Sequence, residues 1–238
     1  MSRIFLVGSG PSLKDTPMDA LIGEDVMVMN KWNRISKELR FSLKPKYYFK
    51  IDYNSYDHLS WKEEIAWAKD NCEKLYLWEQ FKTGYPVGHS NYEHMPEGVG
   101  NLSNVQWLKK CKHTPYQWDN WKAVQSWHLP ELCTAFGGMS TMVQIAAMEY
   151  DEIYLLGCDL GYTPDRTKNH AIPNYTIDDS NKVEMDNGNM TTLHEMAKRC
   201  SPVPIYNATI GGALEVYPRV NIFEILKGKE HAYQEKSS

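Results

Sequence analysis

The hydrophobic positions of this chain fall into short apolar runs that alternate with amphipathic segments. Apolar runs rich in β-forming residues occupy residues 3–7, 26–29, 47–51, 75–77, 153–156 and 204–206. Apolar positions at helical spacing indicate helices over residues 13–22, 59–72, 140–150 and 190–200. Strands that are apolar throughout and alternate with helices are typical of a parallel sheet covered on both faces. The pattern therefore predicts an α/β fold with a doubly wound, mostly parallel, Rossmann-like sheet.

The regular pattern is interrupted over residues 81–130. This interval holds half of the chain's eight Trp and half of its eight His, with few aliphatic residues in sequence. We expect it to be an insertion that acts as a lid, whose Trp side chains either stack on sugar faces or simply pack in the core. Residues 1–226 are then a single Rossmann-like nucleotide-binding domain with the insertion 81–130, and residues 227–238 form a polar tail.

Composition excludes several classes of protein. The 238 residues are 42% hydrophobic and 24% charged, which is ordinary for a globular chain and unlike a disordered or fibrous one. The net charge is −4 and no basic block occurs, so we expect no nucleic acid partner. No apolar run approaches the roughly 20 residues that cross a bilayer, and no signal-peptide pattern is present. The five cysteines are scattered without metal-ligand spacing, which favours reduced thiols in a cytoplasmic protein. The oligomeric state stays open, and a homo-oligomer is one alternative.

Polar residues follow the predicted strands at the point where each strand ends. In open α/β sheets, ligands bind outside the carboxyl ends of the strands. The shared position of these residues therefore predicts one binding edge. The set comprises Gly8, Ser9, Gly10, Pro11, Ser12, Asn30, Asp52, Gly157, Cys158, Asp159 and Asn207.

Two glycine-containing segments precede predicted helices. Gly8 to Ser12 reads GSGPS, which is neither the dinucleotide fingerprint nor a Walker A loop. Its glycines and helix start suit a phosphate, or else form a tight turn in which Ser12 is the N-cap. Gly137, Gly138 and Met139 repeat the arrangement, either to hold an anion or to allow close packing of helix on sheet.

Three side chains after the 153–156 strand suit acid–base chemistry. Asp159 ends that strand, and Tyr162 and His170 lie in the polar loop that follows it. Histidine titrates near neutral pH and serves in acid–base catalysis, so His170 is the candidate base, or else a solvated residue of the loop. His194, in the next predicted helix, is the alternative. No metal-binding spacing such as HExxH occurs, so we expect no metal site.

Several of these motifs carry a resemblance to a known family. Residues 3–13, which read RIFLVGSGPSL, are similar to the opening of the bacterial sialyltransferases that cap lipooligosaccharide. In that family a G-N-G-P-S-L turn holds cytidine monophosphate (CMP), and Asn30 resembles its nucleotide-contacting asparagine. The helix start at Gly137 and Gly138 and the strand 152–159, EIYLLGCD, also resemble that family. The resemblance implies tyrosines after the Asp and a later His as base. Ser9 stands where that family has Asn.

Motifs at the same strand ends also resemble those of a second family, whose members are domains of unknown function. That family includes motility accessory proteins that modify flagellin and an archaeal 6-hydroxymethylpterin diphosphokinase. Its motifs resemble residues 157–162 (GCDLGY), 169–171 (NHA), 207–213 (NATIGGA) and the pair Ile51–Asp52.

These resemblances imply a transferase. The first reading is a glycosyltransferase, resembling sialyltransferases, that moves a sugar from a CMP-sugar-like donor to a glycan hydroxyl. His170 would then be the general base, Tyr162 would stabilise the departing phosphate, and no cofactor would be required. The alternatives are an ATP-dependent diphosphotransferase, which would need Mg²⁺ at Asp52 and Asp159, and a non-catalytic nucleotide- or glycan-binding module.

Overall fold

The computed structural model describes most of the chain: residues 1–51, 60–83, 98–110, 127–128, 131–132, 138–163, 165, 168–173, 175 and 187–227. Within this part, nine strands form one sheet in the order β6-β7-β5-β4-β3-β2-β1-β8-β9. The strands are β1 (Arg3–Val7), β2 (Asp25–Met29), β3 (Tyr47–Lys50), β4 (Lys74–Trp78), β5 (Val105–Lys110), β6 (Trp127–His128), β7 (Glu131–Leu132), β8 (Glu152–Leu156) and β9 (Ile205–Asn207).

The seven strands from β5 to β9 in that order are all parallel, as the apolar runs predict. Strand β1 pairs with β2 on one side and with β8 on the other, with Phe5 opposite Val26 and Tyr154. The strand order reverses at this place, so the topological switch point lies between β1 and β8. Ligand sites of doubly wound sheets occur at such points.

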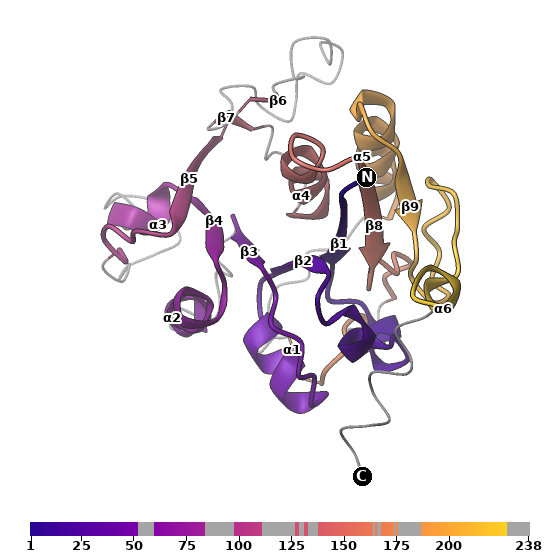
Figure 1. The fold of residues 1–238 in the computed structure, drawn as a ribbon, viewed down its shortest axis with the longest axis horizontal. Coiled ribbons are helices and arrows are strands. Elements are labelled where there is room, and N and C mark those ends of the chain that lie inside the picture. The colour runs from indigo at the N-terminus through magenta and orange to yellow at the C-terminus, as the bar shows by residue number, and fades with distance from the viewer. Residues whose placement is uncertain are drawn as a thin grey trace.

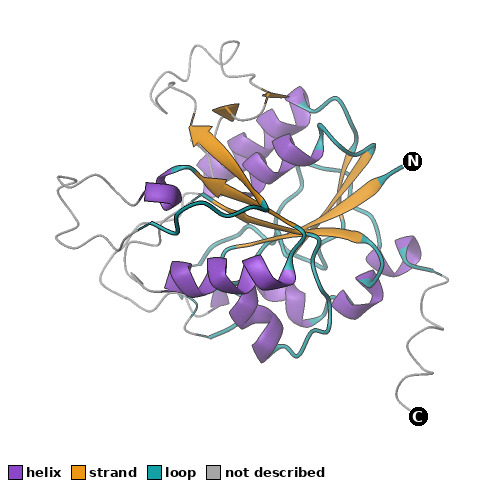
Figure 2. Ribbon diagram, turned by 60° about the vertical axis from the view of Figure 1, so that its left-hand side comes forward, coloured by secondary structure: helices purple, strands orange, loops and turns teal. Residues whose placement is uncertain are grey.

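Helices cover both faces of the sheet, which confirms the predicted α/β class (Figures 1 and 2). Helices α4 and α5 lie on one face, and α1 and α2 lie on the other. The helices are η1 (Pro11–Lys14), η2 (Met18–Leu21), α1 (Trp32–Glu38), α2 (Ser60–Asn71), α3 (Gln80–Thr83), α4 (Gly138–Ala146), α5 (Asn187–Cys200) and α6 (Ile222–Ile225). No helix in the described ranges is long and apolar enough to span a membrane.

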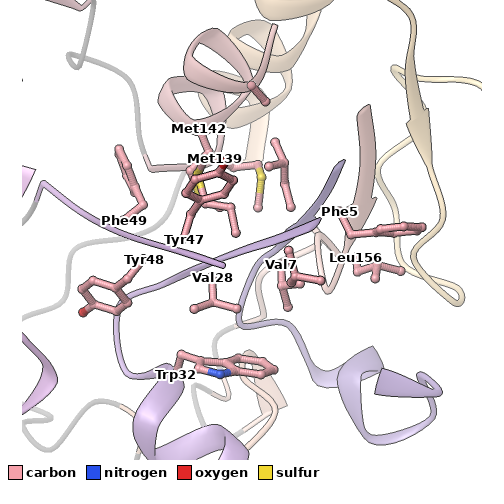
Figure 3. Packing of buried hydrophobic residues seen from close by; sticks show 14 of the residues in the cluster. Phe5, Val7, Val28, Trp32, Tyr47, Tyr48, Phe49, Met139, Met142 and Leu156 are labelled. Atoms are coloured by element: carbon pink, nitrogen blue, oxygen red, sulfur yellow. The ribbon is translucent and has the colours of Figure 1, made fainter. Parts of the chain in front are cut away.

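The core lies on both sides of the sheet, because successive side chains of a strand point to opposite faces. Figure 3 shows Tyr47 and Phe49 near Met139 and Met142, while Trp32 lies on the other side of the strands. All five of these side chains belong to one buried hydrophobic cluster. Many of the chain's aromatic side chains therefore lie in the hydrophobic core.

Some local expectations differ from the structure. The helix expected over residues 13–22 is two short 3₁₀ turns, η1 and η2, separated by Pro17. Strand β5 lies inside the interval expected to be an insertion, and it extends the main sheet beside β4. Residues 84–97, 111–126 and 129–130 of that interval lie outside the described residues, as do residues 228–238 of the tail. The lid and the tail therefore stay predictions.

One buried ion pair lies at the carboxyl end of β3. The Lys50 ammonium contacts the Glu64 carboxylate of α2, and both side chains are essentially inaccessible, at 0% and 1% exposure. Tyr48 donates a hydrogen bond to the same carboxylate at 3.2 Å. A buried charge that loses its partner is far more costly than an exposed one.

We predict that Glu64→Gln lowers the free energy of unfolding by about 3–5 kcal/mol, because the Lys50 ammonium stays buried without a counter-charge. Urea unfolding measures the difference. The control is Glu224→Gln, which removes the partner of Lys227 from a pair that is 65–72% exposed. We expect the control to lose less than about 1 kcal/mol. Equal losses in the two variants would contradict this account of the pair.

Candidate functional site

The turns that follow β1 and β8 form the centre of the predicted binding edge. Beyond the end of β1, the amide of Gly8 donates to Leu156 O at 2.8 Å, and the amide of Gly10 donates to Gly157 O at 2.9 Å. The pairing of β1 with β8 therefore continues into the two turns. The switch point is closed by direct backbone contact between them.

The glycines of the first turn are required by this contact. A Cβ atom on Gly8 would lie 2.5 Å from Gly157 O, and one on Gly10 would lie 1.8 Å from Asp159 Oδ2. Gly10 would also bring its Cβ within 2.7 Å of Gly157 O. The expectation that these glycines make room for a phosphate is therefore not needed to explain them. Here they let one turn lie against the other.

Asp159 joins the same two turns through Ser12. The Ser12 amide donates to Asp159 Oδ1 at 3.1 Å, and the Ser12 hydroxyl donates to Oδ2 at 2.7 Å. The expectation that Ser12 is an N-cap is wrong, because Gly10 holds that position and Ser12 serves Asp159 instead. Burial raises the pKa of Asp159, while the Ser12 hydrogen bonds and the charge of Arg219 oppose that rise. The contacts give Asp159 a structural role between the turns.

The amides of the first turn are largely taken up by these contacts. Those of Gly8, Gly10 and Ser12 all donate within the chain, and Pro11 has no amide hydrogen. The expectation of a phosphate cradle built from these amides has no support in this arrangement.

His170 lies against the same turn. Its Nδ1 atom is 3.1 Å from the Ser9 hydroxyl oxygen, and the next amide, of Ala171, donates to Ser9 O at 2.8 Å. The ring stacks on Tyr175, with 4.0 Å between ring centroids and 20° between planes. Burial and the positive charge of Lys31 lower the pKa of His170 to about 4, and the Ser9 backbone opposes them. The imidazole is therefore neutral at physiological pH.

Tyr162 lies near the same turns. Burial raises its pKa, and the neighbouring Cys158 and Asp159 add to the rise through their negative charge when ionised. Its hydroxyl is therefore neutral, and acts as a hydrogen-bond donor at physiological pH. A neutral hydroxyl suits the hydrogen bond to a departing phosphate that is expected of Tyr162 from the sequence.

His194, the alternative base, is in the core. It lies on α5 with only 5% of its surface exposed. Its Nδ1 atom is 3.1 Å from the Tyr217 hydroxyl, which in turn donates to His194 O at 3.1 Å. Burial lowers the pKa of His194 to about 4. These contacts favour a structural role for His194, and they leave His170 as the better placed of the two.

Asn30 makes backbone hydrogen bonds to neighbouring strand residues, and the start of α4 packs on the sheet. Asn30 has a left-handed backbone, with φ of 51°. Its amide donates to Phe49 O at 3.3 Å and its carbonyl accepts from the Tyr48 hydroxyl at 2.9 Å. A Cβ atom on Gly138 would lie 2.1 Å from Met29 Cε, and Met139 is only 8% exposed. The described contacts at Gly138 and Met139 therefore fit close packing of helix on sheet, not anion binding.

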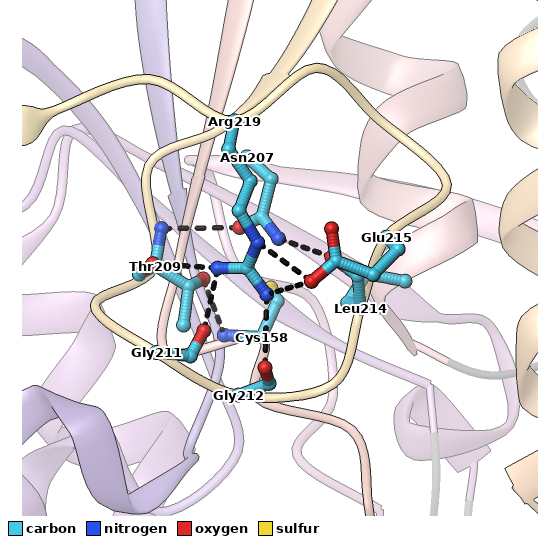
Figure 4. A network of polar contacts seen from close by, with 8 residues as sticks. All are labelled: Cys158, Asn207, Thr209, Gly211, Gly212, Leu214, Glu215 and Arg219. Carbon is cyan, nitrogen blue, oxygen red and sulfur yellow. Dashed lines mark hydrogen bonds and ion pairs between the residues drawn. The ribbon is translucent and has the colours of Figure 1, made fainter.

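Asn207 holds the loop that braces Asp159. It is 1% exposed, its side-chain nitrogen Nδ2 donates to Leu214 O, and its side-chain oxygen accepts from the Thr209 amide (Figure 4). The Ala213 amide then donates to Asp159 O at 2.6 Å. Both polar ends of the Asn207 side chain are thus used inside the protein, which explains the residue without a nucleotide.

Arg219 closes this loop. Its guanidinium donates to the carbonyls of Thr209, Gly211 and Gly212 and pairs with Glu215 (Figure 4). Sequence reasoning missed Arg219, because no strand end or motif marks it. It also missed Lys31 and Tyr175. Lys31 directly follows Asn30, so its position after β2 is a signal that was available.

Two expected site residues, Asp52 and Gly137, lie outside the described residues. Within the described ranges, no group of three or more His, Cys, Asp or Glu side chains is placed to hold a metal ion. The candidate site thus contains Ser9, His170 and Tyr162. Tyr175 stacks on the imidazole of His170, and Lys31 donates a hydrogen bond to the Tyr175 carbonyl.

Comparison with known proteins gives the fold a context. No family model matches the sequence, and no curated protein matches it significantly. Solved structures do match. The MAf glycosyltransferase of Magnetospirillum magneticum AMB-1 aligns with 92% of this chain at 15% identity and a TM-score of 0.52. The chain spans only 33% of that larger protein.

The sialyltransferase CstII is similar over nearly its whole length. The structure of the Campylobacter jejuni protein in complex with the substrate analogue CMP-3FNeuAc aligns with 92% of this chain and 86% of its own, at 16% identity and a TM-score of 0.50. The structure of CstII in complex with a trisaccharide acceptor and CMP aligns with the same coverages and identity, and its TM-score is 0.51. The chain has the fold of these glycosyltransferases.

We predict that Gly10→Ala lowers the free energy of unfolding by about 1–3 kcal/mol, because its Cβ would meet the backbone of Gly157 and the Asp159 carboxylate. The matched control is Gly138→Ala, whose Cβ would overlap the flexible end of Met29 and would meet Phe49 Cε1 at an ordinary contact distance of 3.5 Å. We expect a change below about 1 kcal/mol there, since Ala also favours the helix. Urea unfolding compares the two. A Gly10→Ala variant as stable as the control would show that the turns are not in close contact.

Proposed function

We propose that this chain is a glycosyltransferase that moves a sugar from a CMP-sugar-like donor to a hydroxyl group of a glycan, with His170 as the general base. The observation that carries the proposal is the neutral, partly buried imidazole of His170. It is held against the turn after β1, at the switch point of the sheet. A neutral imidazole at a ligand-binding edge is able to accept a proton.

In this reaction the acceptor hydroxyl oxygen forms a bond to the anomeric carbon of the donor sugar. The bond from that carbon to the phosphate oxygen breaks, and CMP leaves with the electron pair. His170 takes the proton of the attacking hydroxyl. Tyr162 donates a hydrogen bond to the departing phosphate, on which negative charge increases.

The low pKa of His170 applies to the chain with no sugar donor bound. Burial and the Lys31 ammonium disfavour the charged imidazolium. An anionic donor phosphate placed near the ring would favour it and raise the pKa toward neutrality, where a general base is most effective. Binding of the sugar donor would thus bring the pKa of His170 into the range in which it acts as an effective base.

The similar solved structures support the choice of substrates. CstII was solved with CMP, with a CMP-sugar analogue and with a trisaccharide acceptor. These proteins are 15–17% identical to this chain and share its fold, so the substrates are proposed by analogy of fold. The proposal also includes a cytoplasmic location and activity without a metal.

We predict that His170→Ala lowers the rate of transfer by about 10² to 10⁴, as expected for the loss of a general base. The assay is release of CMP from CMP-N-acetylneuraminic acid, with lactose as acceptor and with EDTA present. In the parent chain, kcat/KM reports the free enzyme and should stay level on the acidic side until the pH nears the His170 pKa of about 4.

The matched control is His194→Gln, which alters a buried histidine outside the site. We expect it to unfold more easily but to keep at least half of the transfer rate. Full activity in a folded His170→Ala variant would remove His170 from the mechanism. Sugar transfer that stops with EDTA and returns with Mg²⁺ would contradict the metal-free reaction. No CMP release, together with Mg²⁺-dependent consumption of ATP, would favour diphosphotransfer instead.

A further inference from the structure

Ser9 makes two contacts with the segment that carries the proposed base. Its backbone oxygen accepts a hydrogen bond from the Ala171 amide at 2.8 Å. Its hydroxyl oxygen lies 3.1 Å from Nδ1 of His170. One residue of the turn after β1 therefore fixes both the backbone and the ring nitrogen of a segment 161 positions away in the sequence.

The face of the imidazole is held as well. Tyr175 stacks on it at 4.0 Å between centroids. Tyr175 is itself held by Lys31, whose ammonium donates to the Tyr175 carbonyl at 2.8 Å and lies 5.6 Å from the centre of its ring. With Ser9 at one nitrogen and Tyr175 against the face, the ring has one orientation. Its Nδ1 atom points to the first turn and its Nε2 atom points elsewhere.

We propose that Ser9 is the positioning residue of His170: its hydroxyl oxygen accepts a hydrogen bond from Nδ1–H, which leaves Nε2 as the nitrogen without a proton. The role of Nε2 in catalysis rests on the proposed function, whereas the tautomer does not. A neutral imidazole carries one ring proton, and the partner of one nitrogen decides where that proton lies.

Two features of the neighbourhood favour the proton on Nδ1. The Ser9 hydroxyl oxygen lies 3.1 Å from Nδ1, and the Ser9 backbone opposes the lowering of the His170 pKa by burial and the Lys31 charge, so Ser9 favours a protonated ring nitrogen. The Tyr175 hydroxyl is buried and makes no hydrogen bond of standard geometry with the residues that the structure describes. Burial raises the pKa of Tyr175, and the Ser9 hydroxyl is close enough to oppose this. A Ser9 hydroxyl that accepts from His170 keeps its own proton to donate toward Tyr175.

The tautomer is measured directly by long-range ¹H–¹⁵N NMR spectra of the ¹⁵N-labelled full chain at pH 7.5. The His170 signals are assigned by their absence in His170→Gln. We expect the parent chain to show a neutral ring with the proton on Nδ1. Ser9→Ala should move the proton to Nε2, the form that a free imidazole prefers, and Ser9→Thr should keep it on Nδ1.

A second serine serves as control. Ser36 donates only a local bond to Asn33 O, at 3.2 Å, so Ser36→Ala should leave the His170 signals unchanged. A parent chain with the proton on Nε2, or a Ser9→Ala variant that keeps it on Nδ1, would overturn the proposal. If Ser9→Ala does not fold, the parent spectrum decides alone.

Kinetics separate this proposal from the proposed function. If both hold, Ser9→Ala lowers kcat by about 10- to 100-fold with little change in KM, because an incorrectly protonated base costs part of general-base catalysis. A chain with the expected Nδ1 proton but no transfer activity would reject the glycosyltransferase and keep the role of Ser9. A chain that transfers sugar but carries the His170 proton on Nε2 would keep the glycosyltransferase function and reject the role of Ser9.

Discussion

The close contact between the turns after β1 and β8 is the constraint on which the rest of the site depends. Gly8 and Gly10 lie against Gly157 and Asp159 with no space for a Cβ atom, and Ser12 donates two hydrogen bonds to the Asp159 carboxylate. Because these turns meet at the switch point, everything attached to either of them is positioned by the contact. Ser9 is in one turn, and His170 is held to it.

Much of the fold follows from the sequence pattern, and the reason is physical. A parallel strand is buried on both faces, so β1, β2, β3, β4 and β8 appear as apolar runs. Strand β5 was missed because its sequence, VQWLKK, mixes polar and apolar residues, as suits a strand near the sheet margin. The segment after β1 looked helical by spacing, but Pro17 divides it into two 3₁₀ turns.

The site was harder to predict than the fold, because strand-end position shows where residues gather but not what they contact. His170, Ser9, Asp159 and Tyr162 were identified by position. The contacts then divided that set: Asp159 and Asn207 hydrogen-bond within the protein, and His170 is neutral beside Ser9. Lys31, Tyr175 and Arg219 act through long-range contacts, which no local pattern reveals.

The central claim is that a cytidine nucleotide binds where the turn after β1 meets His170. A titration of the ¹⁵N-labelled chain with CMP, followed by amide ¹H–¹⁵N spectra, tests it most directly, with ATP and Mg²⁺ as the comparison. The account predicts that CMP shifts the amides of Gly8, Ser9, Gly10 and Ser12, and those of His170 and Ala171, more than any others among the described residues. Shifts confined to other parts of the sheet, or shifts at these amides with ATP and Mg²⁺ but not with CMP, would contradict it.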